Sequence, residues 1–294
     1  MKRIVWALNP FDLDREPPAK LARILRGYWP QGTIYPFYIG SRLDINLALA
    51  FDIPEEQRHS DYLFITLEND LTSMGLSDLA ANARTMFVPT MSYKVLATKM
   101  CEYARSVEAD VIAVSTHARS GIPRVALGSF TETLVHTSPI SVFTVNPDIV
   151  PRDRLKRLLY ASDLTVRAQA GFRRVLAMAE RDRLDVILYH AVYPYPTNSV
   201  ADLLDDEVHI EVEEAKLAVE TLKQDATLTG LTLTDIWDQD YESIADRILH
   251  QAKKHDCDLI VVQAHAGPVE AMLLGSVSRK VIRESAIPVL ILKI

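Results

Sequence analysis

Short apolar runs alternate with amphipathic segments along the second half of the chain. The apolar runs are nearly uninterrupted, which is typical of strands buried on both faces of a parallel sheet. They predict strands at 157–162, 185–192, 231–237, 258–263 and 288–293. Helical spacing of apolar residues between these runs predicts helices at 165–181, 208–222, 243–254 and 276–284. Strand–helix alternation of this kind predicts an α/β fold with helices on both faces of a parallel sheet.

The first half follows the same order with a less regular middle. An apolar run and a polar turn occupy residues 3–12, and a second buried-type run occupies 110–114. Residues 40–83 form a longer excursion that we expect to be helical in part, at 42–51 and 77–84.

The two halves are copies of one unit. Residues 110–145 and 258–292 both begin with Asp and an apolar run, and both reach a histidine, His117 or His265, seven positions later. Both then carry Leu-Gly-Ser, at 127–129 and 274–276, before a helical stretch and a final apolar run. An offset of about half the chain indicates a domain duplication and excludes a short solenoid repeat. The proline-bearing segment near 147–151 therefore separates two expected domains, 1–147 and 152–294.

Composition narrows the class of protein. The formal net charge is −7, with 48% hydrophobic and 24% charged residues, which is ordinary for a globular protein. A net negative chain argues against nucleic acid as the main partner. The apolar runs are too short for a membrane span or a signal-peptide core. Two cysteines in unrelated contexts indicate a reduced, cytoplasmic protein without disulfides.

The strongest local signal is the loop that leads into each Leu-Gly-Ser. The first backbone N–H groups of a helix favour a phosphate, so Ser129 and Ser276 are candidate phosphate contacts. Ser129 and Glu132 also fit a capping box, in which the serine side chain caps its own helix. The sequence leaves both interpretations open.

These duplicated strand–loop–Leu-Gly-Ser–helix–strand units resemble universal stress protein domains over nearly the whole chain. The resemblance implies two similar domains, each with a five-stranded parallel sheet of the adenine nucleotide alpha hydrolase-like, Rossmann-type fold. It also implies that the last strands, at 140–145 and 287–292, pair with each other within the chain. Pairing of whole chains into a homodimer stays open.

The family's nucleotide-binding members carry G-x2-G-x9-G-[ST] in this loop and an Asp after the first strand. The corresponding first-half positions are Asn9, Ser115, Ala118, Gly128 and Ser129. The corresponding second-half positions are Asp163, Gln263, Ala266, Gly275 and Ser276, with Ala191 at the family's adenine pocket. Each half departs from the pattern, because both leading glycines are replaced in both halves. The second half keeps the Asp but has eight residues in place of nine before Gly275.

The resemblance thus implies a stress-response protein that binds ATP or another adenine nucleotide, with or without Mg²⁺, in at least one half. The alternative is a nucleotide-independent scaffold that acts through pairing and protein contacts. No nucleophile–base set or metal-ligand spacing is visible, so we expect slow ATP hydrolysis at most.

Several polar residues have a structural and a functional interpretation. His117, His190 and His265 fit satisfied histidines better than catalytic or metal-binding ones. Asp12 and Asp14 fit a capped turn or a contact to Mg²⁺.

Overall fold

The computed structural model describes residues 2–12, 14–41, 56–116, 128–191, 216–217, 219–224, 226–227, 230–238, 242–266, 272–273 and 275–294. The chain forms two compact units. The first contains residues 1–154, 264–275 and 282–293, and the second contains residues 155–263, 276–281 and 294. None of the helices in the described ranges is long and apolar enough to cross a membrane.

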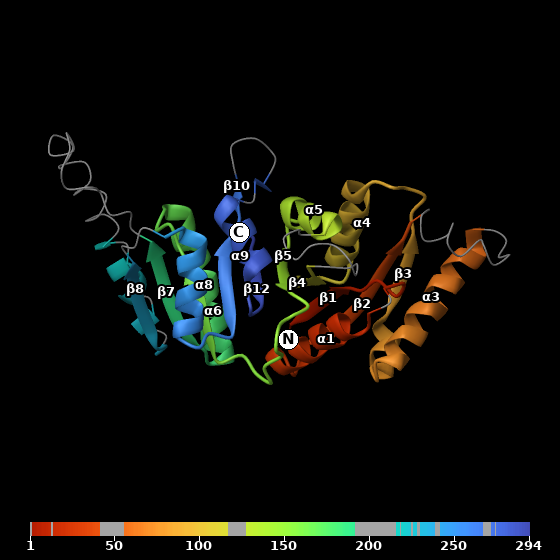
Figure 1. Cartoon of the computed structure of the whole chain (residues 1–294), viewed down its shortest axis with the longest axis horizontal. Coiled ribbons are helices and arrows are strands. Elements are labelled where there is room, and N and C mark those ends of the chain that lie inside the picture. The colour runs from red at the N-terminus through yellow and green to blue at the C-terminus, as the bar shows by residue number, and fades with distance from the viewer. Residues whose placement is uncertain are drawn as a thin grey trace. The chain divides into compact units, whose positions relative to one another are not determined.

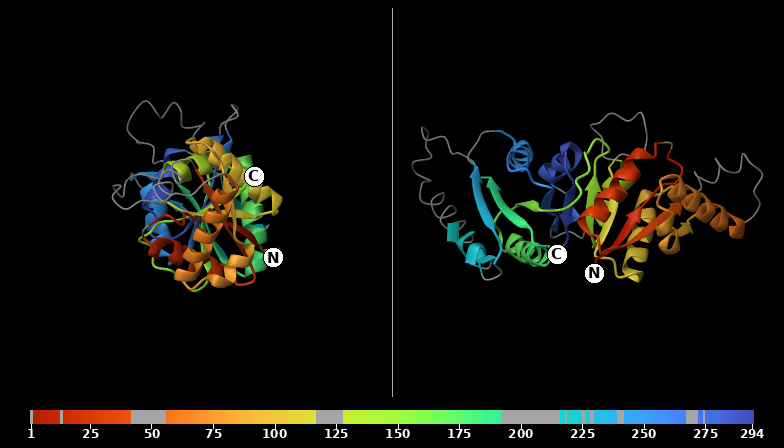
Figure 2. Two further views of the ribbon diagram at one scale, coloured as in Figure 1. Left: turned by 90° about the vertical axis from the view of Figure 1, so that its right-hand side faces the viewer. Right: turned by 90° about the horizontal axis from the view of Figure 1, so that it is seen from below.

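The first unit contains a doubly wound parallel sheet. Its strands are β1 (Arg3–Ala7), β2 (Thr33–Gly40), β3 (Arg84–Phe87), β4 (Val111–Ser115) and β5 (Ser141–Val145). Its other elements are α1 (Glu16–Tyr28), α3 (Glu56–Ser73), the 3-10 helix η1 (Ser77–Asn82), α4 (Tyr93–Ser106) and α5 (Ser129–Thr137). The strands run in the order β3-β2-β1-β4-β5, all parallel, with helices on both faces (Figure 1, Figure 2). The sheet reverses its order between β1 and β4, and in such folds ligands bind beyond the carboxyl ends of the strands there.

The first unit also contains the last strand of the chain, β12 (Val289–Leu292). This strand pairs antiparallel with β5, with Leu290 opposite Phe143. The pairing of the two last apolar runs, which the family resemblance implies, is therefore present.

The second unit repeats the strand order of the first. Its strands are β6 (Arg157–Ala161), β7 (Asp185–Ala191), β8 (Leu233–Asp238) and β9 (Leu259–Gln263). They lie in the order β9-β6-β7-β8 and are parallel. The helices are α6 (Val166–Asp182), α8 (Ile244–Lys254) and α9 (Ser276–Glu284), of which α9 extends from the second unit into the first. The predicted α/β fold with a mostly parallel sheet is confirmed.

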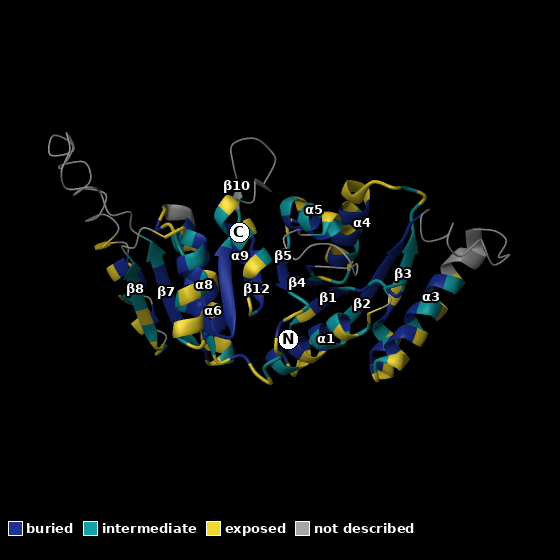
Figure 3. Cartoon of the chain, viewed as in Figure 1, coloured by how far each residue is buried: buried dark blue, intermediate teal, exposed yellow. Residues whose placement is uncertain are grey.

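Apolar strands make the core of each unit, as the near-continuous runs predict. Residues such as Ile4, Ile112, Leu158 and Val261 are fully buried. Figure 3 shows the strands mostly buried, whereas the helices expose their outer faces. The helices are amphipathic because burying one face and hydrating the other is what favours them next to a sheet.

The irregular part of the first half differs from its prediction. Residues 77–84, expected to be helical, form η1 and then the first residue of β3. The short strand β3 was not predicted, because it is half-exposed and has no continuous apolar run. Expected helix 42–51 lies outside the described residues, as does part of expected helix 208–222, of which 216–217 and 219–222 are helical.

Candidate functional site

The turn after β6 presents Asp163 at the carboxyl end of the sheet. Asp163 Oδ1 accepts hydrogen bonds from Thr165 N at 3.1 Å and from Thr165 Oγ1 at 2.8 Å. Thr165 Oγ1 in turn accepts from Ala168 N at 3.3 Å, which caps α6. Leu164, between them, is buried with a φ of +59°, so the backbone reverses within a single residue. The turn is therefore held on both sides, and the Asp163 side chain is held in an exposed position.

Two rings lie beside this turn at the ends of β7 and β8. His190 Nδ1 is 2.9 Å from the Ser162 carbonyl oxygen, and the His190 ring meets the Trp237 ring edge-on at 5.3 Å. Burial lowers the pKa of His190, against smaller opposite effects from Ser162 and Asp163. His190 is thus a neutral histidine with a backbone partner, as its structural interpretation predicts. Ala191 follows it at the end of β7 and is half-buried.

Gln263 ends β9 and directs its side chain at α6. The Tyr160 hydroxyl lies 2.9 Å from both Gln263 Oε1 and the Ala168 carbonyl oxygen. A Cβ on Gly171 would come within 2.6 Å of Gln263 Oε1, so the glycine is what lets α6 approach this pair. Burial, with a smaller effect of Asp163, raises the pKa of Tyr160 and keeps the phenol protonated. Sequence reasoning missed Tyr160, because a tyrosine within an apolar run is not distinguishable from core.

The rest of the second-half loop is described in part. Ala266 belongs to β10 (His265–Ala266), which pairs antiparallel with β11 (Met272–Leu273). Gly275 precedes α9, and no atom of the described residues lies within 4 Å of where its Cβ would be. Ser276 is the first residue of α9 and is exposed. By contact, Ala266 and Gly275 belong to the first unit, whereas Asp163, Ala191, Gln263 and Ser276 belong to the second.

The corresponding turn of the first half is self-contained. Asn9 Oδ1 accepts from Phe11 N at 3.1 Å, and Asn9 Nδ2 donates to Asp12 Oδ1 at 2.9 Å. The Phe11 ring lies 5.7 Å from that of Tyr38 and 6.3 Å from that of Tyr62. Asn9 thus uses both ends of its amide within the turn.

Acidic residues of this segment also serve local structure. Asp14 Oδ1 accepts from Glu16 N at 3.0 Å at the start of α1, and Asp12 accepts from Asn9. Both bonds agree with the capped-turn interpretation. Among the described residues, no group of three His, Cys, Asp or Glu is placed to hold a metal ion.

The first-half loop joins β4 to α5 through backbone contacts. Gly128 N donates to the Thr116 carbonyl oxygen at 2.9 Å, and Thr131 Oγ1 donates to the Ser115 carbonyl oxygen at 3.1 Å. Gly128 is the N-cap of α5, which has no side-chain cap, so the capping-box interpretation of Ser129 is wrong. Ser129 is instead the first helical residue and is exposed. Ala118 and His117 lie outside the described residues.

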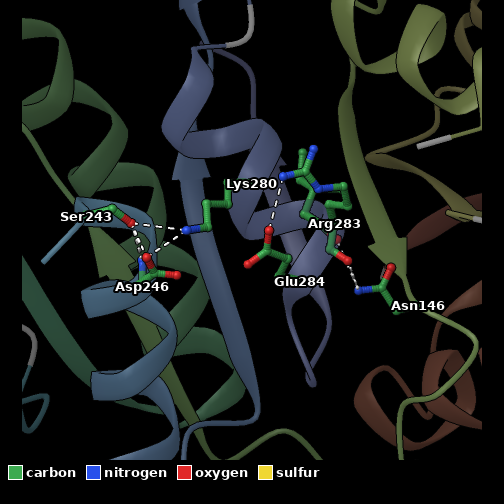
Figure 4. Close-up of polar contacts among 7 residues, drawn as sticks. Asn146, Ser243, Asp246, Lys280, Arg283 and Glu284 are labelled. Atoms are coloured by element: carbon green, nitrogen blue, oxygen red, sulfur yellow. Dashed lines mark hydrogen bonds and ion pairs between the residues drawn. The ribbon is translucent and has the colours of Figure 1, made fainter. Parts of the chain in front are cut away.

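The residue after each last strand caps the end of a helix. Asn146 Nδ2 donates to the carbonyl oxygens of Ile282, Arg283 and Ser285 at 3.1, 3.3 and 2.7 Å, at the end of α9. Figure 4 shows Asn146 beside Arg283. Lys293 Nζ donates to the Val135 carbonyl oxygen at 2.7 Å, in the last turn of α5. Burial lowers the pKa of Lys293 to about 8, against a smaller opposite effect of Cys101. Each side chain satisfies carbonyl groups that a helix end leaves unpaired.

The start of α8 is fastened to α9 by one lysine. Lys280 Nζ donates to Asp246 Oδ2 at 2.6 Å and to Ser243 Oγ at 3.3 Å (Figure 4). Ser243 Oγ also accepts from Asp246 N at 3.3 Å and caps α8. Lys280 thus links the first turn of α8 to α9.

Comparison with known proteins identifies the family of the chain. The model of the universal stress protein family matches the chain twice, at residues 48–146 and 154–293, which together make up more than half of it. A search of curated protein sequences finds no match.

Among solved structures, a universal stress protein from Archaeoglobus fulgidus has a TM-score of 0.66 at 17% identity, over 99% of this chain and 98% of that one. A functionally unknown protein from Pseudomonas aeruginosa has a TM-score of 0.60 at 15% identity, over 99% of this chain and 92% of that one. A universal stress protein solved in complex with cAMP covers 47% of this chain at 22% identity, with a TM-score of 0.35. The two long matches share the fold over the whole length. With the family match in each half, they show that the chain belongs to the universal stress protein family and carries two of its domains in tandem.

Proposed function

We propose that the second half of the chain binds an adenine nucleotide, ATP above all, as part of a stress response. The observation that carries this proposal is the exposed Asp163 carboxylate on a turn that its own hydrogen bonds hold in place. A single well-placed polar group beside an apolar wall sets the orientation of a ligand. Ala191 would contact the base, Asp163 the ribose or the base edge, and Ser276 a phosphate.

The loop positions of the second half have a lesser part in this proposal. The Gln263 side chain is engaged with Tyr160, so its contribution to a ligand would come from the backbone. We assign Ala266 and Gly275 to backbone contacts as well. Mg²⁺ would be carried on the nucleotide phosphates, and slow hydrolysis is the most turnover that these residues support.

The scaffold alternative describes the first half better. Both ends of the Asn9 side-chain amide are hydrogen-bonded within the turn, and Gly128 N, the amide at the start of α5, already donates to the Thr116 carbonyl oxygen. We therefore propose that Asn9, Ser115, Ala118, Gly128 and Ser129 form the weaker or non-binding copy of the site. We also propose domain limits of 1–147 and 152–294, a cytoplasmic location, and no nucleic-acid or membrane partner.

The first test is mass spectrometry of small molecules released by denaturing freshly purified protein. Stoichiometric AMP, ADP or ATP supports the nucleotide proposal, and a different metabolite or none counts against it. Calorimetric titration with ATP then assigns the half. Asp163→Ala should weaken binding by about tenfold or more, and the matched change Asn9→Ala by less than about twofold.

Asp163→Asn separates the two roles of the side chain. It keeps the acceptor that holds the turn and removes the charge. Loss of affinity in both Asp163 variants, with unchanged melting temperature in Asp163→Asn, supports a direct contact to the ligand. Equal ATP affinity in the wild type and all three variants would show that the site is assigned to the wrong residues.

A further inference from the structure

Arg247 is a deeply buried arginine on α8, and only one of its three guanidinium nitrogens has a hydrogen-bond partner among the described residues. Its side chain is 2% exposed. Nη1 donates to the Asp238 carbonyl oxygen at 3.0 Å and lies 3.8 Å from Asp238 Oδ1. Nε and Nη2 have no hydrogen-bond partner among the residues that the structure describes. These two nitrogens form one edge of the guanidinium, and that edge is the fork with which arginine holds an oxyanion through two parallel bonds.

Gln251, one turn later on α8, also has one side-chain polar atom with a partner and one without. Its Nε2 donates to Asp238 Oδ2 at 3.3 Å, but its buried Oε1 has no donor in the described part of the chain. The Tyr189 hydroxyl donates to the same Asp238 oxygen at 3.3 Å. Asp238 thus gathers Tyr189, Arg247 and Gln251 around itself, and two of these three side chains retain unused polar atoms.

The position of this cluster is one where α/β proteins bind ligands. Asp238 is the last residue of β8 and pairs in register with Ala191, the last residue of β7. The cluster therefore lies at the carboxyl ends of parallel strands, where such sheets hold their ligands. It uses none of the polar side chains of the proposed nucleotide site, Asp163, Gln263 and Ser276.

Buried polar atoms without partners rarely persist in proteins, so the unused atoms describe what is missing. Three N–H groups of Arg247 need acceptors, and Gln251 Oε1 needs a donor. The missing group therefore offers at least two oxygens to the fork and one hydroxyl to the amide. Because Asp238 lies beside the same guanidinium, a group of low charge fits better than a highly charged one.

We propose that Arg247 and Gln251 bind a protonated phosphate group. Two phosphate oxygens accept from Arg247 Nε and Nη2, and the P–OH group donates to Gln251 Oε1. Tyr189 and Asp238 hold the two side chains in place. Free phosphate and the phosphate of a monoester share this chemistry.

The test follows the Nε–Hε signals of the arginines by NMR in the 15N-labelled full chain. Inorganic phosphate is titrated at constant ionic strength, with chloride as the balancing salt. The Arg247 signal, assigned by its absence in Arg247→Lys, should move along a saturable curve. An Arg247 signal that does not move with phosphate, or that moves equally with chloride, would overturn the proposal.

Variants test each contact. Arg247→Lys keeps the charge but loses the fork, and should weaken phosphate binding by roughly tenfold or more. Arg279→Lys, an exposed arginine on α9, is the matched control and should leave binding unchanged. Gln251→Ala tests the hydroxyl contact, because sulfate at neutral pH has no proton to donate. The wild type should prefer phosphate to sulfate, and the variant should lose that preference. A wild type that binds both equally would overturn the hydroxyl contact.

Competition with AMP distinguishes free phosphate from the phosphate of a nucleotide monoester as the ligand. Competition between AMP and inorganic phosphate for the Arg247 signal would indicate a nucleotide monoester, and independence would indicate free phosphate. Asp163→Ala separates this site from the proposed nucleotide site. Phosphate binding at Arg247 should survive that change even if ATP binding is lost, and its loss would contradict a separate site.

Discussion

The two halves of the chain leave their first strand through turns that share one hydrogen bond but differ in backbone conformation. In each half a side-chain oxygen accepts from the backbone N–H two residues later, at 3.1 Å for both Asn9 and Asp163. The amide nitrogen of Asn9 donates to Asp12, and the Phe11 ring lies 5.7 Å from the ring of Tyr38. Asp163 remains exposed, and the residue after the reversal caps α6. Leu164 reverses the second turn with a φ of +59°, whereas the corresponding residue of the first turn is Pro10, whose ring fixes a negative φ. The same side-chain contact thus occurs in a self-contained turn in one copy and in an exposed one in the other.

The residues after the two last strands sharpen this comparison most. Asn146 and Lys293 each donate to carbonyl groups at a helix end, one through an amide nitrogen and the other through Nζ. Asn146→Asp replaces a donor by a negative charge beside three carbonyl oxygens at the end of α9, where the helix dipole is also negative. We expect a loss of about 3 kcal/mol in the free energy of unfolding. Urea unfolding of the whole chain measures it.

Lys293→Met is the partner experiment in the second copy. It removes one hydrogen bond to Val135 but keeps the buried aliphatic stem, so the expected loss is about 1 kcal/mol. Losses of similar size in the two variants would show that the two caps are equivalent.

Mild acid should affect the two halves in opposite directions. Burial, partly offset by Arg15, raises the pKa of Asp70 on α3 to about 6. The folded state holds this proton more tightly than the unfolded chain, so Asp70 lowers stability as pH rises from about 4 to 6, by about 2–3 kcal/mol in all. The pKa of His190 is lowered instead. Its contribution to stability is therefore complete above the pKa of the unfolded chain and is lost as the pH falls from there to the lower pKa of the folded state.

Hydrogen exchange measured between pH 4.5 and 7 separates these two effects. Around α1 and α3, protection should increase toward acid pH, and around the ends of β7 and β8 it should decrease. Asp70→Asn should remove the first trend and leave the second. A trend around α3 that persists in Asp70→Asn would assign it to another group.

Strands and most helices were predictable because burial fixes their pattern. Strands β6 to β9 and β12 and helices α6, α8 and α9 begin and end within about two residues of their predicted limits, whereas the two-residue strands β10 and β11 were not predicted. Strand β3 was missed because an edge strand needs no continuous apolar run. The carbonyl groups that Asn146 caps and the tyrosine that Gln263 contacts lie more than 100 residues away along the chain, and no local pattern encodes such contacts.

The helix starts give a smaller contrast. Thr165 caps α6 with its side chain, whereas α5 begins after Gly128 with no side-chain cap. Thr165→Ala should therefore cost about 1 kcal/mol, and Ser129→Ala only a few tenths, roughly. Thermal unfolding of both variants compares them. A cost for Ser129→Ala equal to that of Thr165→Ala would restore the capping box that the sequence suggested.

The smallest contrast is between the two loop glycines, which occupy equivalent positions. A Cβ on Gly128 would lie 3.2 Å from the Thr116 carbonyl oxygen, whereas none of the residues described around Gly275 comes within 4 Å of one there. Gly128 has a φ of −58°, so the backbone itself accepts alanine and only the contact opposes it. We expect Gly128→Ala to cost about 1 kcal/mol and Gly275→Ala to be neutral within about 0.5 kcal/mol.

ATP titration of the same two variants tests whether either glycine is needed for ligand binding. If Gly275→Ala weakens ATP binding while leaving stability unchanged, the glycine is needed for the approach of a ligand and not for the packing of the loop. If it changes neither, Gly275 has no role in the site and the second-half loop has to be reassigned.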